Sequence, residues 1–272
     1  MRLWRSEVTE IPYYRQLADA REWINGLPRE VAAQAGVLMR LLEQADNDQR
    51  IRAVSLEGSM ARGGADELSD IDARIWVADD EFDSMLADLP SLARAVGAPL
   101  DILFETPGSH YLFVQYADGT QLELLALRAS EATGAVSGEL VLIDRDGRLR
   151  GIEETPATWD TNLWLGWAWM RLFDLEKYLR RGVVWRALIK LEEARTLLLR
   201  HHAATTGVPE PQLGLTSILN FHGTLPMRLE ETVAGLDAAD LRRAACVCAE
   251  LLATYERRPF GDLVQARLAA RE

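Results

Sequence analysis

The 272-residue chain has few of the side chains from which zinc sites and disulfides are built, with only two cysteines and four histidines. Cys246 and Cys248 lie two positions apart in a segment that we expect to be helical. This spacing places them on different helix faces, so neither a mutual disulfide nor a shared metal site is expected. The histidines show neither the HExxH nor the H-x₃₋₅-H spacing of zinc ligands. The sequence therefore does not favour zinc chemistry.

Long apolar runs are also missing. No stretch approaches the twenty apolar residues that a membrane span requires. The first residues, MRLWRSEVTE, have neither the apolar core nor the cleavage site of a signal peptide. These absences predict a cytoplasmic protein without a membrane span.

Acidic residues outnumber basic ones in the first half of the chain, by 26 to 15 in residues 1–150. The formal net charge is −12, of which −11 falls in residues 1–150 and −1 in residues 151–272. A protein that grips a nucleic-acid backbone needs a basic stripe, and none is visible. We therefore expect no binding to nucleic-acid backbone, and an acidic first half favours cationic or neutral substrates.

The most informative segment is residues 56–77, LEGSMARGGADELSDIDARIWV. A Gly58-Ser59 pair is followed, after ten intervening residues, by Asp70-Ile71-Asp72. The run that begins at Asp70 alternates as a strand does, so Asp70 and Asp72 point to one face and the apolar residues between them to the other. Two carboxylates are thus predicted to project side by side from one strand.

Such a pair of carboxylates suits a divalent cation. Unscreened, like charges roughly 7 Å apart along a strand raise a pKa or weaken the fold, and a bound cation removes that repulsion. Oxygen ligands suit Mg²⁺ or Mn²⁺, with substrate phosphates completing the shell. Upstream, Gly58 would let the backbone approach a ligand, and Ser59 would cap a helix whose first amides attract anions. The motif therefore predicts a site for metal and phosphate.

This arrangement, G-S-x-A-R-G followed by five residues and S-D-I-D, closely resembles the signature of the DNA polymerase β-like nucleotidyltransferase superfamily, in its antibiotic-modifying type. The matching positions are Gly58, Ser59, Ala61, Arg62, Gly63, Ser69, Asp70, Ile71 and Asp72. Because no G-K-[ST] is present, the segment is not a Walker loop. The resemblance is specific over about residues 51–127, and the alternative for this segment is an acidic surface hairpin.

The resemblance implies an enzyme that moves AMP from ATP to a hydroxyl of a small molecule, with an aminoglycoside or lincosamide antibiotic as the acceptor. It implies two Mg²⁺ ions, held by Asp70, Asp72 and a third acid from a later strand that can also serve as the base. Glu123, in the middle of an alternating strand, is our candidate for that acid. Asp101, at the start of another strand, is its rival, and a place on the solvent face is the ordinary alternative.

The resemblance also implies further contacts with the triphosphate. Positions matching Arg62 and Ser69 contact or shape the triphosphate pocket in the family, although Ser69 could equally be a turn residue. In relatives, basic residues of the helical part reach the β- and γ-phosphates, which makes Lys190 a candidate together with Arg186. The alternative for Lys190 is an ion pair with Glu193 on a solvated helix.

The predicted fold class is α+β, with a mixed-sheet catalytic domain over residues 1–150 and a C-terminal helical bundle over residues 151–272. The predicted strands are residues 51–56, 70–77, 100–105, 111–116, 121–127 and 139–143. The predicted helices are about residues 28–45, 79–95, 158–181 and 183–205, with two or three more after residue 213. In the sequence, Thr158 or Asp160 is placed to cap the first helix of the bundle.

Five of the eight tryptophans fall within residues 159–185. Core packing is one interpretation of this cluster. In the other, Trp159 or Trp164 lines the cleft between the two domains and stacks on adenine or substrate, while Asp160 or Glu176 receives a substrate amine.

Two other functions remain open from the sequence. One is nucleotide transfer to a macromolecule, a protein or a tRNA end. The other is a non-catalytic nucleotide-binding or interaction module, against which the intact D-x-D pair argues.

Overall fold

The computed structural model describes residues 13–14, 17–104, 110–135, 138–150 and 160–270. The chain divides into two compact units, Met1–Pro156 and Ala157–Glu272. The functional roles assigned to the two predicted domains stay predictions.

The first unit is built on a six-stranded mixed sheet with the order β3-β4-β5-β2-β1-β6. Its strands are β1 (Ile51–Leu56), β2 (Ile71–Val77), β3 (Pro99–Phe104), β4 (Tyr111–Tyr116), β5 (Gln121–Arg128) and β6 (Leu140–Asp144). The central pair, β2 and β5, is parallel, and the other neighbours are antiparallel. β2, which carries Asp72, and β5, which carries Glu123, therefore run side by side in the same direction.

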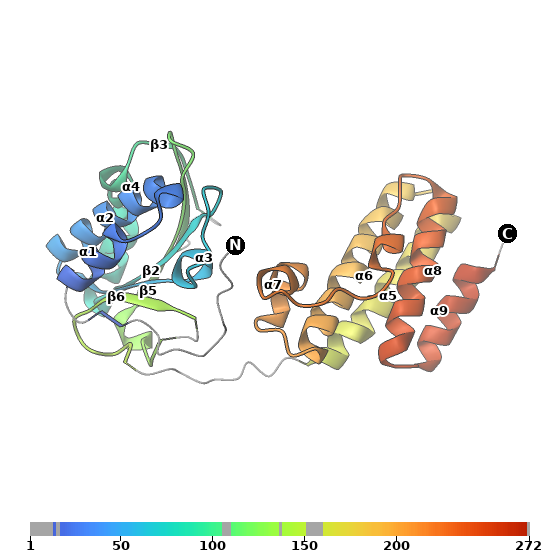
Figure 1. Ribbon diagram of the computed structural model, residues 1–272. Helices are drawn as coiled ribbons and strands as arrows, with labels where there is room; N and C mark the ends of the chain where they lie inside the picture. Colours follow the sequence, from blue (N-terminus) through green and yellow to red (C-terminus); the bar gives the residue numbers. More distant parts are fainter. Residues whose placement is uncertain (1–12, 15–16, 105–109, 136–137, 151–159, 271–272) are drawn as a thin grey trace. The chain divides into compact units, whose positions relative to one another are not determined.

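The helices of this unit pack on one face of the sheet. They are α1 (Leu17–Asn25), α2 (Ala32–Asn47) and α4 (Phe82–Val96). The short α3 (Gly58–Ala61) follows β1, and 3-10 turns lie at Arg29–Val31, Asp79–Glu81 and Ala129–Glu131. In Figure 1, α1, α2 and α4 gather on one side of the sheet. The alternation along β5 accounts for this, because Leu122, Leu124 and Ala126 are buried while Glu123 and Leu125 on the opposite face are only half-buried.

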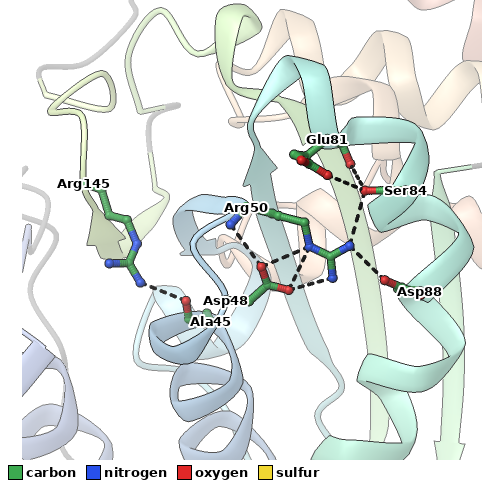
Figure 2. Close-up of polar contacts among 7 residues, drawn as sticks. All are labelled: Ala45, Asp48, Arg50, Glu81, Ser84, Asp88 and Arg145. Atoms are coloured by element: carbon green, nitrogen blue, oxygen red, sulfur yellow. Dashed lines mark hydrogen bonds and ion pairs between the residues drawn. The ribbon is translucent and has the colours of Figure 1, made fainter.

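An ion-pair network ties the end of α2 to β1 and α4. Figure 2 shows the Arg50 guanidinium between two carboxylates, 2.8 Å from Asp48 and 2.8 Å from Asp88. The pKa of Asp48 is lowered, chiefly by the hydrogen bonds from the Arg50 side chain. The Arg145 guanidinium donates to the carbonyl oxygen of Ala45 at 2.9 Å. This hydrogen bond gives a partner to one of the carbonyl groups in the last turn of α2.

The second unit is entirely helical in its described part. Its elements are α5 (Thr161–Arg180), α6 (Val184–Thr205), α7 (Leu215–Asn220), α8 (Ala238–Tyr255) and α9 (Pro259–Ala269), with 3-10 turns at Pro211–Leu213 and Leu229–Thr232. The two longest helices are separated by Gly182, whose positive φ of 69° suits glycine. Trp169 and Cys248 lie in the core that these helices enclose.

The α+β class with C-terminal helices is confirmed, and the element boundaries differ from the predicted ones by a few residues. β2 begins at Ile71, so Asp70 lies just before the strand. The helices predicted from residues 28 and 79 each begin as a 3-10 turn. In the described part of the chain, no helix is long and apolar enough to cross a membrane.

Candidate active site

Three carboxylates converge where β2 and β5 run in parallel. The register pairs Asp72 directly with Glu123, and Asp70 immediately precedes β2. One carboxylate oxygen from each of Asp70, Asp72 and Glu123 lies within 4.8 Å of the others, and all three side chains are half-buried. Among the described residues, this acidic triad is the one group of its kind. The structure thus brings together the three acids that the sequence singled out, whereas their roles stay a proposal.

The triad concentrates negative charge. The pKa of Asp72 is raised to about 6, first by burial and then by the charges of Asp70, Glu123 and Glu57, while Arg62 acts in the opposite direction. A carboxylate in this position is held charged only at a cost in free energy. A divalent cation would remove that cost, and the all-oxygen donor set fits Mg²⁺ or Mn²⁺.

The Gly58 turn packs directly against the triad. Gly58 has a φ of +64°, and a Cβ atom built on it would lie 1.8 Å from Oδ2 of Asp72. The preceding residue is tied to the same strand, since the backbone N–H of Glu57 donates to the carbonyl oxygen of Asp72 at 2.9 Å. Glycine is therefore required here by the approach of the turn to the carboxylate.

The predicted capping role of Ser59 is wrong. The helix α3 begins at Gly58, two residues earlier than a cap at Ser59 would place it, with Glu57 in the N-cap position and no side-chain cap hydrogen bond. The Ser59 hydroxyl is buried and has no hydrogen-bond partner in the described part of the chain. Because Glu57 is extended and bound to β2, the chain turns into the helix before Ser59.

Hydrogen bonds within the loop that leads into β2 hold its conformation. The Ser69 hydroxyl accepts from the backbone N–H of Asp66 at 3.0 Å and donates to its carboxylate at 3.1 Å, as a turn residue does. Gln34, buried on α2, donates to the carbonyl oxygens of Asp66, Glu67 and Ser69 at 3.4, 3.3 and 3.0 Å. These contacts favour the turn interpretation of Ser69. They also identify Gln34 as a support of the loop, which sequence reasoning missed.

Tyr111 of β4 is a second neighbour that the sequence analysis missed. Its hydroxyl donates to Oε2 of Glu123, and burial together with the carboxylate raises the pKa of Tyr111. Its ring stands edge-on to Phe113 with centroids 4.7 Å apart. Tyr111 therefore holds one oxygen of the Glu123 carboxylate. The signal available in the sequence was its place at the start of an alternating strand.

An ion-pair chain lies beside the triad on the β1 side. Arg74, on the same strand face as Asp72, pairs with Glu57 and lies 3.8 Å from Glu139. The Glu139 carboxylate is almost fully buried and accepts a hydrogen bond from the hydroxyl of Ser55. The alternation of β2 indicated the direction of Arg74, but its partners come from segments far apart in the sequence.

Asp101, the rival third acid, does not reach the triad. It lies on β3, which is separated from β5 by β4, and it is exposed. Glu123 is therefore the acid that the fold brings to Asp70 and Asp72.

The predicted site residues of the second unit have local partners of their own. The Asp160 carboxylate caps α5 by accepting from the backbone N–H groups of Asn162 and Leu163, both at 3.1 Å. The Lys190 ammonium pairs with Glu193 at 2.6 Å, which is the alternative considered from the sequence. Trp164 is half-buried on α5.

Two further candidates of this unit are Glu176 and Trp159. Glu176 is buried and pairs with Arg180, as a structural ion pair does. Trp159 lies outside the described residues. Binding of phosphate by Lys190, and of acceptor by Asp160 and Trp164, stays a prediction.

A mixed sheet that brings three carboxylates to one point beside a glycine turn is what the resemblance to the nucleotidyltransferase superfamily implied. Residues 33–164 match the model of a protein family described as streptomycin adenylyltransferase. This match confirms the predicted resemblance to antibiotic nucleotidyltransferases, and with it the prediction of an adenylyltransferase enzyme.

Comparisons with individual proteins add less. No curated protein matches the chain. Among solved structures, an aminoglycoside 6-adenyltransferase from Bacillus subtilis is 16% identical with a TM-score of 0.32, over 87% of this chain and 90% of that one. The CD-NTase CdnG of Bradyrhizobium diazoefficiens, in complex with GTP, is 14% identical with a TM-score of 0.31, over 93% and 88%. At scores this low, neither similarity bears on the function.

Proposed function

We propose that this adenylyltransferase moves AMP from ATP to a hydroxyl group of an aminoglycoside or lincosamide antibiotic in a Mg²⁺-dependent reaction. The observation that carries the proposal is the convergence of Asp70, Asp72 and Glu123 within a segment that matches the streptomycin adenylyltransferase model. Mg²⁺ held by these three residues would neutralise the triphosphate and favour ionisation of the attacking hydroxyl.

In this reaction the hydroxyl oxygen of the acceptor forms a bond to the α-phosphorus of ATP. The bond from that phosphorus to the oxygen bridging to the β-phosphate breaks, and pyrophosphate leaves. Glu123 takes the proton of the hydroxyl as general base. Tyr111 supports this role, because its hydroxyl donates to Oε2 of Glu123 and so restrains the carboxylate.

The residues around the Gly58 turn would receive the triphosphate. Arg62 ends α3 close enough to act on the charge of Asp72, and the same guanidinium can counter phosphate charge. The buried hydroxyl of Ser59 is a polar group for which the described chain offers no partner, as expected of a site completed by a ligand.

The charge of the first unit supports a cationic acceptor. Residues 1–150 carry a net charge of −11, which attracts a polycationic aminoglycoside and opposes a second polyanion besides the nucleotide. Lincosamides, with less positive charge, would gain less from this field.

Pyrophosphate release tests the proposal. The protein is incubated with each of the four nucleoside triphosphates, with and without Mg²⁺, across a panel of aminoglycosides and lincosamides. We expect acceptor-dependent release with ATP and Mg²⁺, and AMP attached to the acceptor by mass spectrometry. Release that requires a protein or tRNA acceptor would overturn the small-molecule assignment.

A further inference from the structure

The geometry points to an acceptor subsite on the face of β3, β4 and β5, with Asp101 as the residue that selects a positively charged acceptor. This inference rests on the proposed function and identifies where its acceptor would bind. The subsite is a cavity of about 400 Å³, called the β3–β5 cavity below, with a lining that includes Asp101, Leu103, Phe113, Gln115, Gln121 and Glu123.

The sheet register places these six side chains on one face. Asp101 pairs with Gln115, which pairs with Gln121, so one row crosses the three strands. Leu103 pairs with Phe113, which pairs with Glu123, and these form the next row. The β3–β5 cavity therefore reaches from an exposed edge strand directly to the proposed general base.

The cavity and the glycine turn approach the triad from opposite sides. In the strand order β3-β4-β5-β2-β1-β6, the cavity lies over β3 to β5, whereas Gly58 follows β1 on the far side of β2. A triphosphate at the turn would leave the β3–β5 cavity to the second substrate. Transfer between two substrates requires this arrangement, because the attacking hydroxyl must meet the α-phosphorus from the side away from the leaving pyrophosphate.

The lining has the chemistry of a site for a hydroxylated amine. Among the lining residues that the structure describes, the two charged members, Asp101 and Glu123, are both acids and none is basic. Within the described chain, Asp101 takes part in no ion pair; one carboxylate oxygen accepts from the backbone N–H of Ile102 at 2.9 Å. An ammonium or guanidinium group would give it a charge-assisted partner.

The neutral residues of the lining could contact the rings and hydroxyl groups of such an acceptor. Leu103 is 57% exposed although it is apolar, and it lies beside the ring of Phe113, so the pair offers a surface for the carbon face of a sugar or cyclitol ring. The side-chain amide of Gln121 donates to that of Gln115 at 2.9 Å, and such amides can bind acceptor hydroxyls.

The spacing of the acids limits the size of the acceptor. Two strand spacings of about 4.8 Å separate β3 from β5, and Glu123 lies two residues along β5 from the row of Asp101, so the two acids are roughly 12 Å apart diagonally across the sheet. The favoured acceptor therefore carries its reacting hydroxyl roughly 12 Å from a cationic group, a distance that spans two linked rings.

The test compares Asp101→Asn with the matched control Asp80→Asn. Both variants remove one exposed negative charge, and Asp80 lies in the 3-10 turn after β2, outside the cavity lining. Steady-state kinetics are measured with ATP, Mg²⁺ and streptomycin, or with the aminoglycoside that the wild type turns over best. We expect Asp101→Asn to raise the KM for the acceptor about tenfold, with kcat and the KM for ATP unchanged, and Asp80→Asn to leave all three unchanged.

Several outcomes would overturn the subsite while leaving the proposed function intact. An unchanged acceptor KM in Asp101→Asn would do so, as would an equal rise in Asp80→Asn, which would indicate a field effect of net charge. A collapse of kcat at constant KM would make Asp101 catalytic rather than selective. Transfer to neutral acceptors alone would also overturn it. If the wild type transfers AMP to no small molecule, the proposed function itself is wrong.

Discussion

Gly58 and Asp72 lie so close that no side chain fits between them: a Cβ atom on Gly58 would stand 1.8 Å from Oδ2 of Asp72. The contact joins the turn after β1 to the middle of the acidic triad. A substitution at Gly58 must therefore displace the carboxylate or the turn, and either movement disturbs the proposed site for metal and triphosphate.

We expect Gly58→Ala to lower kcat/KM at least about 10²-fold, since a displacement of about 1 Å at a catalytic group can cost that much. Gly63→Ala is the matched control. Gly63 shares the positive φ, at +71°, but a Cβ atom there meets nothing within 4 Å. The control should lose only about 1 kcal/mol of stability from the backbone conformation and keep its activity. Equal loss of activity in the two variants would show that the Gly58 contact with Asp72 is not critical.

The raised pKa of Asp72 predicts a trade-off between stability and function in the metal-free protein. Because the folded pKa of about 6 lies above the unfolded value near 3.9, the charged form is disfavoured in the fold. The contribution of Asp72 to the free energy of unfolding is therefore fully present below pH 4, where the carboxyl group is protonated in both states. It is lost as the pH rises through 6. Asp72→Asn should therefore raise the free energy of unfolding at pH 8 by about 1 kcal/mol, after screening by water, with no gain at pH 3.5.

Thermal unfolding in EDTA at both pH values measures this effect. Added Mg²⁺ should stabilise the wild type and not the variant, since ligand binding to the folded state raises its stability. A variant that is less stable than the wild type at pH 8 without metal would contradict the assigned electrostatics.

Glu123→Gln separates chemistry from binding. Glutamine keeps the size of the side chain and one ligand oxygen but cannot take the proton of the acceptor hydroxyl. We expect kcat to fall about 10²–10⁴-fold with little change in ATP affinity. If Glu123 acts chiefly as a metal ligand, ATP binding should weaken as well.

Tyr111→Phe is the companion variant. It removes the hydrogen bond to Oε2 of Glu123 and should lower kcat by a smaller factor at constant KM. Near-normal kcat in Glu123→Gln, with a collapse in Asp101→Asn, would show that the third acid had been assigned to the wrong strand.

The Arg50 network predicts how the first unit responds to acid. The pKa of Asp48 is lowered, chiefly by the hydrogen bonds from Arg50. The ion pair therefore stabilises the fold above the unfolded pKa of Asp48, and this stabilisation is lost as the pH falls through the folded pKa. Asp48→Asn should cost about 0.5–1 kcal/mol at neutral pH, because the pair is partly exposed and screened. The difference from wild type should vanish near pH 3 in denaturant titrations. A constant difference from pH 7 to pH 3 would contradict an ionic origin.

The sequence was sufficient for the parts of the site that depend on local pattern. The alternation in residues 70–77 and 121–127 gave the faces of Asp72 and Glu123, and the motif gave the order of strand, turn and strand. The meeting of these acids then required only that two alternating strands be neighbours, which the resemblance implied.

The residues that sequence reasoning missed depend on contacts between distant segments. Gln34 supports the loop before β2 across 32 to 35 positions, and Ser55 reaches Glu139 across 84. No periodicity within α2 or β1 distinguishes these polar residues from solvent-facing ones. The helix start was misplaced by two residues for a related reason, because the hydrogen bond from the Glu57 N–H to Asp72 joins the end of β1 to a segment 15 positions away.

The central claim is that the acidic triad binds a divalent cation together with ATP. Calorimetric titration of ATP into the wild type and into the Asp70→Ala, Asp72→Ala double variant, each with Mg²⁺ and with EDTA, tests it most directly. We expect tight binding only in the wild type with Mg²⁺, and a double variant that keeps its fold by circular dichroism. Equal ATP affinity in the wild type with and without the metal would contradict the account.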